Sequence, residues 1–421
     1  ALAAGGAQAR ELRGAALAGQ LRGVRMASGC DMRFCDAPCL AGTGEMNSWS
    51  VLGCQVRYCC PTQPPSAAPT QAPSTAPTQS ATANWMAEYA SDDLTLQDLV
   101  LPMAHDAGAN PLAMRQDLCD FDPSNSLILL LLNFFGGDAL RQFAETQDLS
   151  IADQLSLGIR AFDLRPSCRD EDGQAKLYNQ HGTDFARCFF DQGMTDISSV
   201  ASFLETHPSE VVVLEFTNMF ALGGCIDNLV ARVQGVAHLL FTPADLVDGS
   251  WPSLSGMVQS NKRLVIRTSG ALGHAFFDDV STGVAFTGQA RVNGFQGGES
   301  DVAGLVKHLQ SFLASSSYSS AVVTELTWTL TATETVIRDG ILSERKLYTP
   351  RTLAKERSNP VTVASVNGES GLLAGLAGTT RAPSYISTDY VGQFDSDLVE
   401  GVVLPFNAEH VALLRAAAKT P

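Results

Sequence analysis

The chain lacks a long uninterrupted apolar run. Its longest stretch of large apolar residues, 127–132, is far shorter than the roughly 18 residues that a membrane-spanning helix needs. Charged residues are also scarce, at 17%, whereas hydrophobic residues make up 45% of the sequence. This combination excludes a disordered polar chain and predicts a folded protein with a large core.

Basic residues are outnumbered by acidic ones. The sequence contains 28 lysines and arginines against 44 aspartates and glutamates, and its net charge is −16. Nucleic-acid binding needs a basic face that displaces counterions from phosphates, so we predict no nucleic-acid partner. The same negative field opposes docking on strongly anionic membranes, and attraction to an anionic ligand has to come from local arginines.

The ten cysteines fall into two groups. Six lie within residues 29–60, a segment without histidine, and the others are Cys119, Cys168, Cys188 and Cys225. An even number in each group predicts disulfides, an oxidising compartment and therefore a secreted or extracellular protein. A structural zinc site built from cysteine alone is the alternative for the first group.

Composition divides the chain into four parts. We predict a mobile segment at 1–28, a cysteine-rich disulfide module at 29–60, a stiff Pro/Thr/Ser-rich linker at 61–83, and one larger domain at 84–421. The module is too small to bury a sufficient core and would depend on its bridges. A carbohydrate or a surface partner is the class of ligand expected for this module.

The larger domain alternates between short apolar stretches typical of strands and longer stretches with helical spacing, such as 200–206, 229–240 and 302–313. The predicted strands are 99–103, 159–164, 176–180, 211–216, 263–267, 284–291, 321–327 and 384–388. Eight such units predict an α/β fold, a TIM-type (β/α)8 barrel of regular or irregular form. Functional residues of such barrels gather where the strands end.

Ionisable side chains stand at the ends of the first three predicted strands. His105 and Asp106 follow the first, Asp163 and Arg165 end the second, and His181 follows the third. Histidine suits both proton transfers of phosphodiester cleavage because it titrates near neutral pH. A guanidinium can hold two phosphate oxygens and balance the charge that builds on them. The pattern therefore indicates a phosphodiesterase.

These segments, in this order, resemble the X domain of phosphatidylinositol-specific phospholipase C. The resemblance rests on 101–108, on 158–165 and 177–182, on the Leu-x-x-His-Pro-x-Glu-x-Val pattern within 203–216, and more weakly on 384–390. It implies a TIM-type barrel that cleaves phosphatidylinositol or glycosylphosphatidylinositol. Attack by the inositol 2-hydroxyl would give a cyclic phosphate and diacylglycerol.

The resemblance also implies a role for each side chain. His105 matches the general base, and His181 matches the general acid that protonates the departing glycerol oxygen. Arg165 stands where bacterial-type members carry an arginine and calcium-dependent members a carboxylate ligand. Asp106 matches the partner of that arginine near the leaving group, and Asp163 is expected to support Arg165 or His181.

Three further residues complete the predicted site. Asp389 matches the carboxylate that orients the base, and Arg267 is a candidate for binding the headgroup. Glu215 stands where the best known bacterial members carry lysine and calcium-dependent members a glutamate ligand, so it is a candidate substrate-binding residue in a hybrid site. Because Arg165 would repel a divalent ion, we predict that no metal cofactor is needed, with calcium the less favoured alternative.

The resemblance implies a phospholipid or glycolipid substrate and transient contact with a membrane surface, which we expect to be mostly neutral. Residues 127–135, between the first two strands, are interpreted either as a greasy lid or membrane anchor or as a helix packed on the barrel. We also predict disulfides between Cys168 and Cys188, and between Cys119 and Cys225.

Two other functions fit parts of this pattern. A non-catalytic extracellular recognition or adhesion protein could retain the same barrel, although such a protein has no need of His105, Arg165 and His181 together. A metal-dependent glycerophosphodiester or sphingolipid phosphodiesterase would cluster carboxylates around an ion, and Arg165 disfavours that arrangement. Asp163 and Arg165 could also form a purely structural ion pair at the barrel rim.

Overall fold

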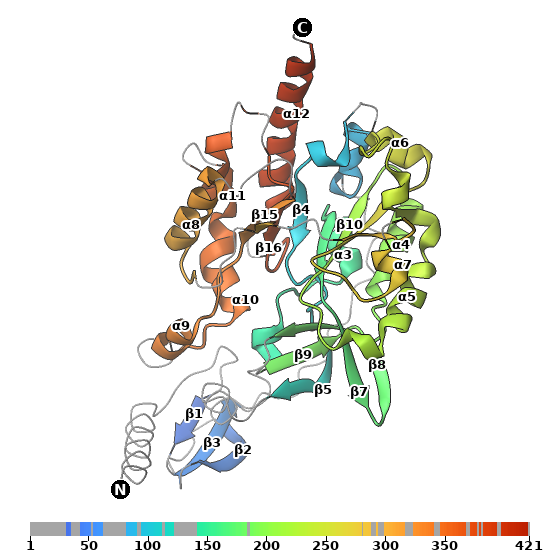
Figure 1. The fold of residues 1–421 in the computed structure, drawn as a ribbon. Helices are drawn as coiled ribbons and strands as arrows, with labels where there is room; N and C mark the ends of the chain where they lie inside the picture. Colours follow the sequence, from blue (N-terminus) through green and yellow to red (C-terminus); the bar gives the residue numbers. More distant parts are fainter. Residues whose placement is uncertain are drawn as a thin grey trace, which may run out of the picture.

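Figure 1 shows the fold, taken from a computed structural model. The structure describes residues 31–34, 43–51, 54–61, 81–90, 94–111, 114–121, 141–182, 186–279, 281–287, 292–293, 299–315, 323–340, 346–367, 371–376, 379, 382–393 and 397–419. The predictions for 1–28 and 127–135 lie outside the described residues, as does most of the predicted linker. No helix in the described part of the chain is long and apolar enough to cross a membrane.

A sheet of parallel strands forms the centre of the larger domain. Its strands are β4 (Leu101–Ala104), β6 (Ala161–Leu164), β10 (Val212–Phe216), β11 (Leu240–Phe241), β12 (Leu264–Thr268), β13 (Ala285–Thr287), β14 (Val292–Asn293), β15 (Thr324–Trp328) and β16 (Tyr385–Thr388). Pairing runs from β13 through β12, β10, β6, β4, β16 and β15 to β14, so that the last strand lies beside the first. This arrangement confirms the predicted TIM-type barrel.

Helices cover the barrel strands, with α4 to α7 on one side of Figure 1 and α8 to α11 on the other. The helices are α3 (Ile151–Ser156), α4 (Asp196–Thr206), α5 (Ile226–Gln234), α6 (Leu254–Gln259), α7 (Ala275–Asp278), α8 (Val302–Ala314), α9 (Glu334–Asp339), α10 (Pro350–Leu353), α11 (Thr362–Asn367) and α12 (Leu404–Ala418). Shorter 3₁₀ or π segments are η1 (Ala81–Glu88), η2 (Leu96–Asp98), η3 (Leu222–Gly224), η4 (Ala237–Leu239), η5 (Pro243–Asp245), η7 (Ala354–Ser358), η8 (Asn359–Val361), η9 (Leu372–Leu376) and η10 (Val399–Val403). Side chains cap several N-termini, among them Ser150 at α3 and Asp301 at α8.

Alternation along the strands separates two apolar clusters. Phe162 and Leu214 pack with residues of the outer helices, whereas Met103, Ala161 and Val213 belong to a second cluster on the opposite face of the strands. Because side chains two apart in a strand share a face, the residues that follow on this inner face are charged. Two positions after Met103 the sequence has a histidine, two after Ala161 an aspartate, and two after Val213 a glutamate. The barrel interior changes from apolar to polar towards the carboxyl ends of its strands.

A separate antiparallel sheet stands beside the carboxyl ends of the barrel strands. It consists of β5 (Met114–Phe121), β9 (Ala186–Phe190), β8 (Gln174–Gly182) and β7 (Pro166–Glu171), in that order. The prediction that 176–180 is a barrel strand is therefore wrong, because this stretch lies within β8. Asp172 and Gly173 connect β7 to β8 with φ angles of 55° and 76°, the left-handed conformations of a two-residue hairpin turn. Because of this hairpin, β7 pairs directly with β8, and no helix lies between them.

The predicted disulfide pairings are also wrong. Cys119 is bonded to Cys188, and Cys168 to Cys225. Cys119 and Cys188 are directly opposite each other on β5 and β9, with Cα atoms 4.0 Å apart. Strand β8 lies between β7 and β9 and therefore separates Cys168 from Cys188. Cys168 instead meets the loop before α5, where its backbone nitrogen donates to the carbonyl of Phe220 at 3.2 Å.

The cysteine-rich region contains a three-stranded antiparallel sheet, formed by β1 (Asp31–Phe34), β3 (Cys54–Pro61) and β2 (Thr43–Val51). Cys30, Cys35 and Cys39 lie outside the described residues, so the bridges of this region stay a prediction. The barrel begins with η1, which includes the last residues of the predicted linker. Arg160 holds this segment by donating to the carbonyl of Ala83 at 2.7 Å.

Candidate active site

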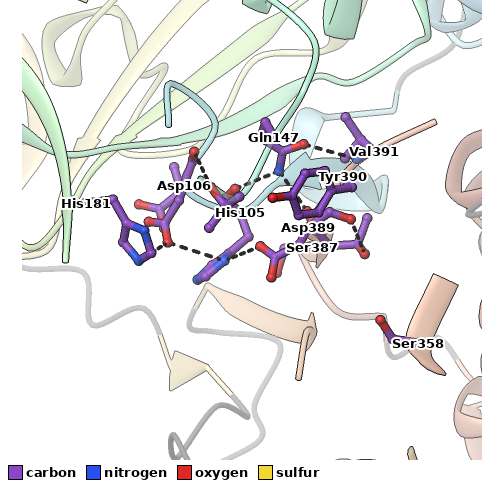
Figure 2. A network of polar contacts seen from close by, with 12 residues as sticks. His105, Asp106, Gln147, His181, Ser358, Ser387, Asp389, Tyr390 and Val391 are labelled. Atoms are coloured by element: carbon purple, nitrogen blue, oxygen red, sulfur yellow. Dashed lines mark hydrogen bonds and ion pairs between the residues drawn. The ribbon is translucent and has the colours of Figure 1, made fainter. Parts of the chain in front are cut away.

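Asp106 contacts both imidazoles of the site, as Figure 2 shows, and it also contacts Arg165. Its Oδ1 contacts Nε of Arg165, and its Oδ2 lies 3.0 Å from Nε2 of His181 and 3.5 Å from Nδ1 of His105. Asp106 is buried, with 1% of its surface exposed, and its backbone is left-handed, with φ 44°. The turn after β4 therefore directs this carboxylate between groups from three different strands.

The two imidazoles predicted from the sequence lie close together. Both contact the same oxygen of Asp106, so their facing nitrogens are separated by less than the sum of 3.0 and 3.5 Å. His105 follows a barrel strand, whereas His181 is part of β8 in the antiparallel sheet. The structure brings them together because β7 and β8 fold back over the end of β6.

His105 is oriented by a second carboxylate. Its Nδ1 lies 2.8 Å from Oδ1 of Asp389, which follows β16, the neighbour of β4. Burial lowers the pKa of His105, but Asp106 and then Asp389 raise it by more, and it reaches about 9. Since Nδ1 is held by Asp389, Nε2 is the nitrogen that can exchange a proton with a ligand.

His181 is placed between two acceptors. Its Nδ1 lies 2.9 Å from the carbonyl oxygen of Ala144, and its Nε2 lies 3.0 Å from Oδ2 of Asp106. A carbonyl and a carboxylate both accept hydrogen bonds, so both contacts are made by the doubly protonated ring. The geometry therefore favours His181 as a proton donor.

Arg165 is fixed by two carboxylates. Its Nη2 donates to Oδ2 of Asp163 at 3.2 Å, while its Nε contacts Asp106. Asp163 is fully buried, and the hydroxyl of Thr217 donates to its Oδ1. Burial raises the pKa of Asp106, but Arg165, His105 and His181 outweigh burial and lower it well below its ordinary value. The cluster therefore contains an ionised carboxylate surrounded by positive charge.

Glu215 and Arg267 lie on adjacent strands and form a buried ion pair. Nε of Arg267 is 2.8 Å from Oε1 of Glu215, and the register also places Glu215 beside Asp163. The hydroxyl of Tyr385 donates to Glu215 at 2.7 Å, although β4 and β6 separate their strands. This contact crosses the barrel interior, so both predicted substrate-binding residues lie on the inner face near Asp163. Their binding of a substrate stays a prediction.

The donor set does not suit calcium. His105, Asp106 and Asp163 offer ligand atoms within 4.8 Å of one another. Arg165 contacts both of these carboxylates, and with a pKa of about 9 His105 is protonated at neutral pH. Calcium requires six to eight oxygen ligands, and a guanidinium in their midst repels it. Glu215, the other candidate ligand, is held by Arg267.

Sequence reasoning missed two sets of residues. Thr217, the first residue after β10, contacts Asp163, and its place at a strand end was an available signal. Residues 144–147 precede α3 and follow no barrel strand, so nothing in their spacing pointed to the site. Three of them contact His105, Asp106 or His181 directly.

Comparisons with known proteins point to one family. The family model of the PI-PLC X domain matches residues 131–281, which include Asp163, Arg165 and His181. Human PI-PLC X domain-containing protein 2 is 28% identical over 169 residues, which are 39% of this chain and 53% of that protein. PI-PLC X domain-containing protein 1 of Arthroderma benhamiae is 30% identical over 182 residues, 41% of this chain and 54% of that protein. The chain thus spans about half the length of these curated relatives.

Two bacterial enzymes are among the solved structures that were superimposed on this chain. A variant of the phosphatidylinositol-specific phospholipase C of Staphylococcus aureus superimposes with a TM-score of 0.48 at 14% identity, covering 77% of this chain and 98% of that one. The enzyme of the same name from Listeria monocytogenes gives a TM-score of 0.46 at 17% identity, covering 76% and 98%. The family model and the curated relatives thus agree that this chain is similar to the PI-PLC X-domain family over the part of its length that they match.

Proposed function

We propose that the protein is a phosphodiesterase of the phospholipase C type, which cleaves phosphatidylinositol or glycosylphosphatidylinositol by attack of the inositol 2-hydroxyl on the adjacent phosphorus. The observation that carries the proposal is the shared contact of His105, His181 and Arg165 with Asp106. An acid, a base and a fixed positive charge within reach of one phosphate are what this reaction requires.

His105 takes the proton from the attacking hydroxyl at Nε2, while Asp389 and Asp106 stabilise the imidazolium that forms. The raised pKa of His105, about 9, means that only a minor fraction of the free protein holds the neutral base at pH 7. Because the neutral fraction of His105 grows about tenfold per pH unit below this pKa, the limb of the kcat/KM profile that reports the base should have its midpoint near pH 9.

His181 protonates the glycerol oxygen as the bond between phosphorus and that oxygen breaks. The proton that passes is the one on Nε2, which lies 3.0 Å from Oδ2 of Asp106 and donates a hydrogen bond to it in the free protein. Arg165 supplies a positive charge at a fixed position for the oxygens of the phosphate. Such preorganised charge contributes about 10²–10³ in rate in comparable sites.

We further propose that the reaction needs no metal cofactor and that the protein acts outside the cell on a lipid surface. Arg165 contacts both carboxylates at which an ion would bind, which supports the first point. The disulfides Cys119–Cys188 and Cys168–Cys225 support the second, since such bonds persist in oxidising compartments.

Phosphorus NMR of the products tests the proposal. Vesicles of phosphatidylinositol, its phosphorylated forms, a glycosylphosphatidylinositol or sphingomyelin are incubated with the protein, with and without chelator. We expect a cyclic inositol phosphate in the presence of chelator, and losses of about 10²–10⁴-fold for His105→Ala and His181→Ala.

His207→Ala is the matched control, because His207 stacks on Phe203 at 4.0 Å, at the carboxyl end of α4. It should keep wild-type activity. Failure of the wild-type protein to cleave any of these inositol lipids, or cleavage that requires added calcium, would overturn the proposal.

A further inference from the structure

Residues 144–147 pass between the ends of β4, β8 and β16, and all four are buried, with exposed fractions of 8% or less. The segment is defined by Ala144, Glu145, Thr146 and Gln147, and it enters α3 a few residues later. All four side chains of the segment are thus largely shielded from solvent. Glu145 pairs with Arg141 at 3.5 Å, and the segment also contacts residues that carry the site.

The first three residues bind three different parts of the site. Ala144 accepts from Nδ1 of His181 at 2.9 Å. The carbonyl of Glu145 accepts from the hydroxyl of Tyr390 at 2.7 Å. Thr146 donates its hydroxyl to the carbonyl of Asp106 at 3.0 Å, and its own carbonyl accepts from the nitrogen of Tyr390 at 2.8 Å.

Gln147 joins the base to the strand that carries its carboxylate (Figure 2). Its Nε2 donates to the carbonyls of His105, at 2.8 Å, and Thr388, at 3.2 Å. Its Oε1 accepts from the nitrogen of Val391 at 3.0 Å. The amide is fully buried and thus bridges the residues on both sides of Asp389 to His105.

The hydrogen bonds of Gln147 lie just beyond the last backbone hydrogen bonds between β4 and β16. The pairing of β4 with β16 ends at Ala104 and Thr388, apart from one bond between the nitrogen of His105 and the carbonyl of Thr388, at 3.1 Å. Beyond it the backbone is left-handed at Asp106, with φ 44°, and at Tyr390, with φ 51°, so the two chains turn away. The contact between His105 and Asp389 therefore needs another support.

We propose that residues 144–147 form a positioning segment that sets the distance and orientation between the two histidines and Asp389, and that Gln147 is its principal positioning residue. The catalytic meaning of this inference rests on the proposed function, whereas the effect on His105 does not. A readout that is independent of turnover can therefore separate the two.

The test replaces Gln147 by leucine and follows His105 by NMR titration in protein with labelled histidines, its signal being assigned with His105→Ala. Asp106, Asp389 and Arg165 are the charged groups that act on His105, and in the wild type its pKa is about 9. Once this bridge is lost the contact of Asp389 with His105 weakens, and we expect this pKa to fall below about 9. We expect kcat to fall about 10–100-fold with KM little changed, because Gln147 touches the base and not the ligand.

Gln154→Leu is the matched control. Gln154 is also fully buried and donates to two carbonyls, those of Ala107 at 3.0 Å and Leu149 at 2.8 Å, but it does not touch His105 or Asp389. Gln154→Leu should lower the free energy of unfolding by an amount comparable to Gln147→Leu and leave the pKa of His105 unchanged. If Gln147→Leu does not fold, Thr146→Val decides the question, since it removes one hydrogen bond and keeps the shape; a smaller fall in the same pKa is expected.

An unchanged pKa of His105 in folded Gln147→Leu, or in Thr146→Val should the former not fold, would overturn the inference and leave the segment a purely structural one. A fall in this pKa without any phosphodiesterase activity in the wild type would instead refute the proposed function and support the positioning role. Loss of activity together with the fall supports both.

Discussion

Replacing Asp106 by asparagine should remove most of the alkaline pH dependence of the protein's stability. The pKa of His105 rises from 6.5 to about 9 on folding, because Asp106 and Asp389 outweigh burial. A raised pKa means that the folded protein binds this proton more tightly than the unfolded chain. The resulting stabilisation is fully present below pH 6.5 and is lost as the pH rises through 9.

The size of the effect follows from the geometry. Since one pKa unit corresponds to about 1.36 kcal/mol, the shift of His105 is equivalent to about 3 kcal/mol. The carboxylate of Asp106 lies 3.5 Å from Nδ1 of His105. At an effective dielectric constant of about 20, unit charges about 4 Å apart interact by about 4 kcal/mol, which is as large as the whole shift. Without this carboxylate the pKa of His105 should return close to 6.5.

Guanidinium unfolding at intervals between about pH 6 and 10 measures this effect. The wild type should lose about 3 kcal/mol across the range, whereas Asp106→Asn and His105→Gln should both show a much flatter profile. Asparagine adopts left-handed backbone readily, so the turn at position 106 is kept. The pH slope of the double variant should equal that of His105→Gln alone. An alkaline slope in Asp106→Asn equal to that of the wild type would refute the reasoning.

Three further outcomes follow from the site and the fold. Asp389→Asn should lower kcat about 10²–10⁴-fold with little change in KM, because the imidazole loses the group that orients it; steady-state kinetics with unchanged kcat would contradict this. Arg165→Lys should lower kcat/KM about 10²–10³-fold in steady-state kinetics, because a lysine ammonium lacks the planar guanidinium whose separate nitrogens contact Asp106 and Asp163. Added calcium should not restore this activity. Serine at both Cys168 and Cys225 should lower the free energy of unfolding by about 2–4 kcal/mol, and chemical unfolding with no loss of stability would argue against that bond.

The barrel and much of its site could be predicted because the signals are local. Alternation along β6 puts Asp163 and Arg165 on the face of Ala161, and the ends of parallel strands meet. The Asp172-Gly173 turn in the sequence also indicated a hairpin, from which the antiparallel sheet could have been predicted. The apolar stretch of β8, however, resembles a barrel strand. His181 thus contacts Asp106, although the strand that carries it was wrongly predicted to belong to the barrel.

Other features depend on which strands become neighbours. The disulfide partners were wrong because Cys119 faces Cys188 only once β5 pairs with β9. Gln147 was missed because its partners His105 and Thr388 are 42 and 241 residues away in the sequence. A buried glutamine bound to backbone carbonyls leaves no pattern that spacing or composition can reveal.

The central claim is that the two imidazoles perform opposite proton transfers at one phosphate. It is tested most directly with an inositol phosphodiester whose leaving group is a nitrophenolate, which departs without a proton. His181→Ala should recover most of its loss of about 10²–10⁴-fold on this substrate, whereas His105→Ala should be as impaired as on the natural lipid. Equal impairment of both variants on both substrates would contradict the account.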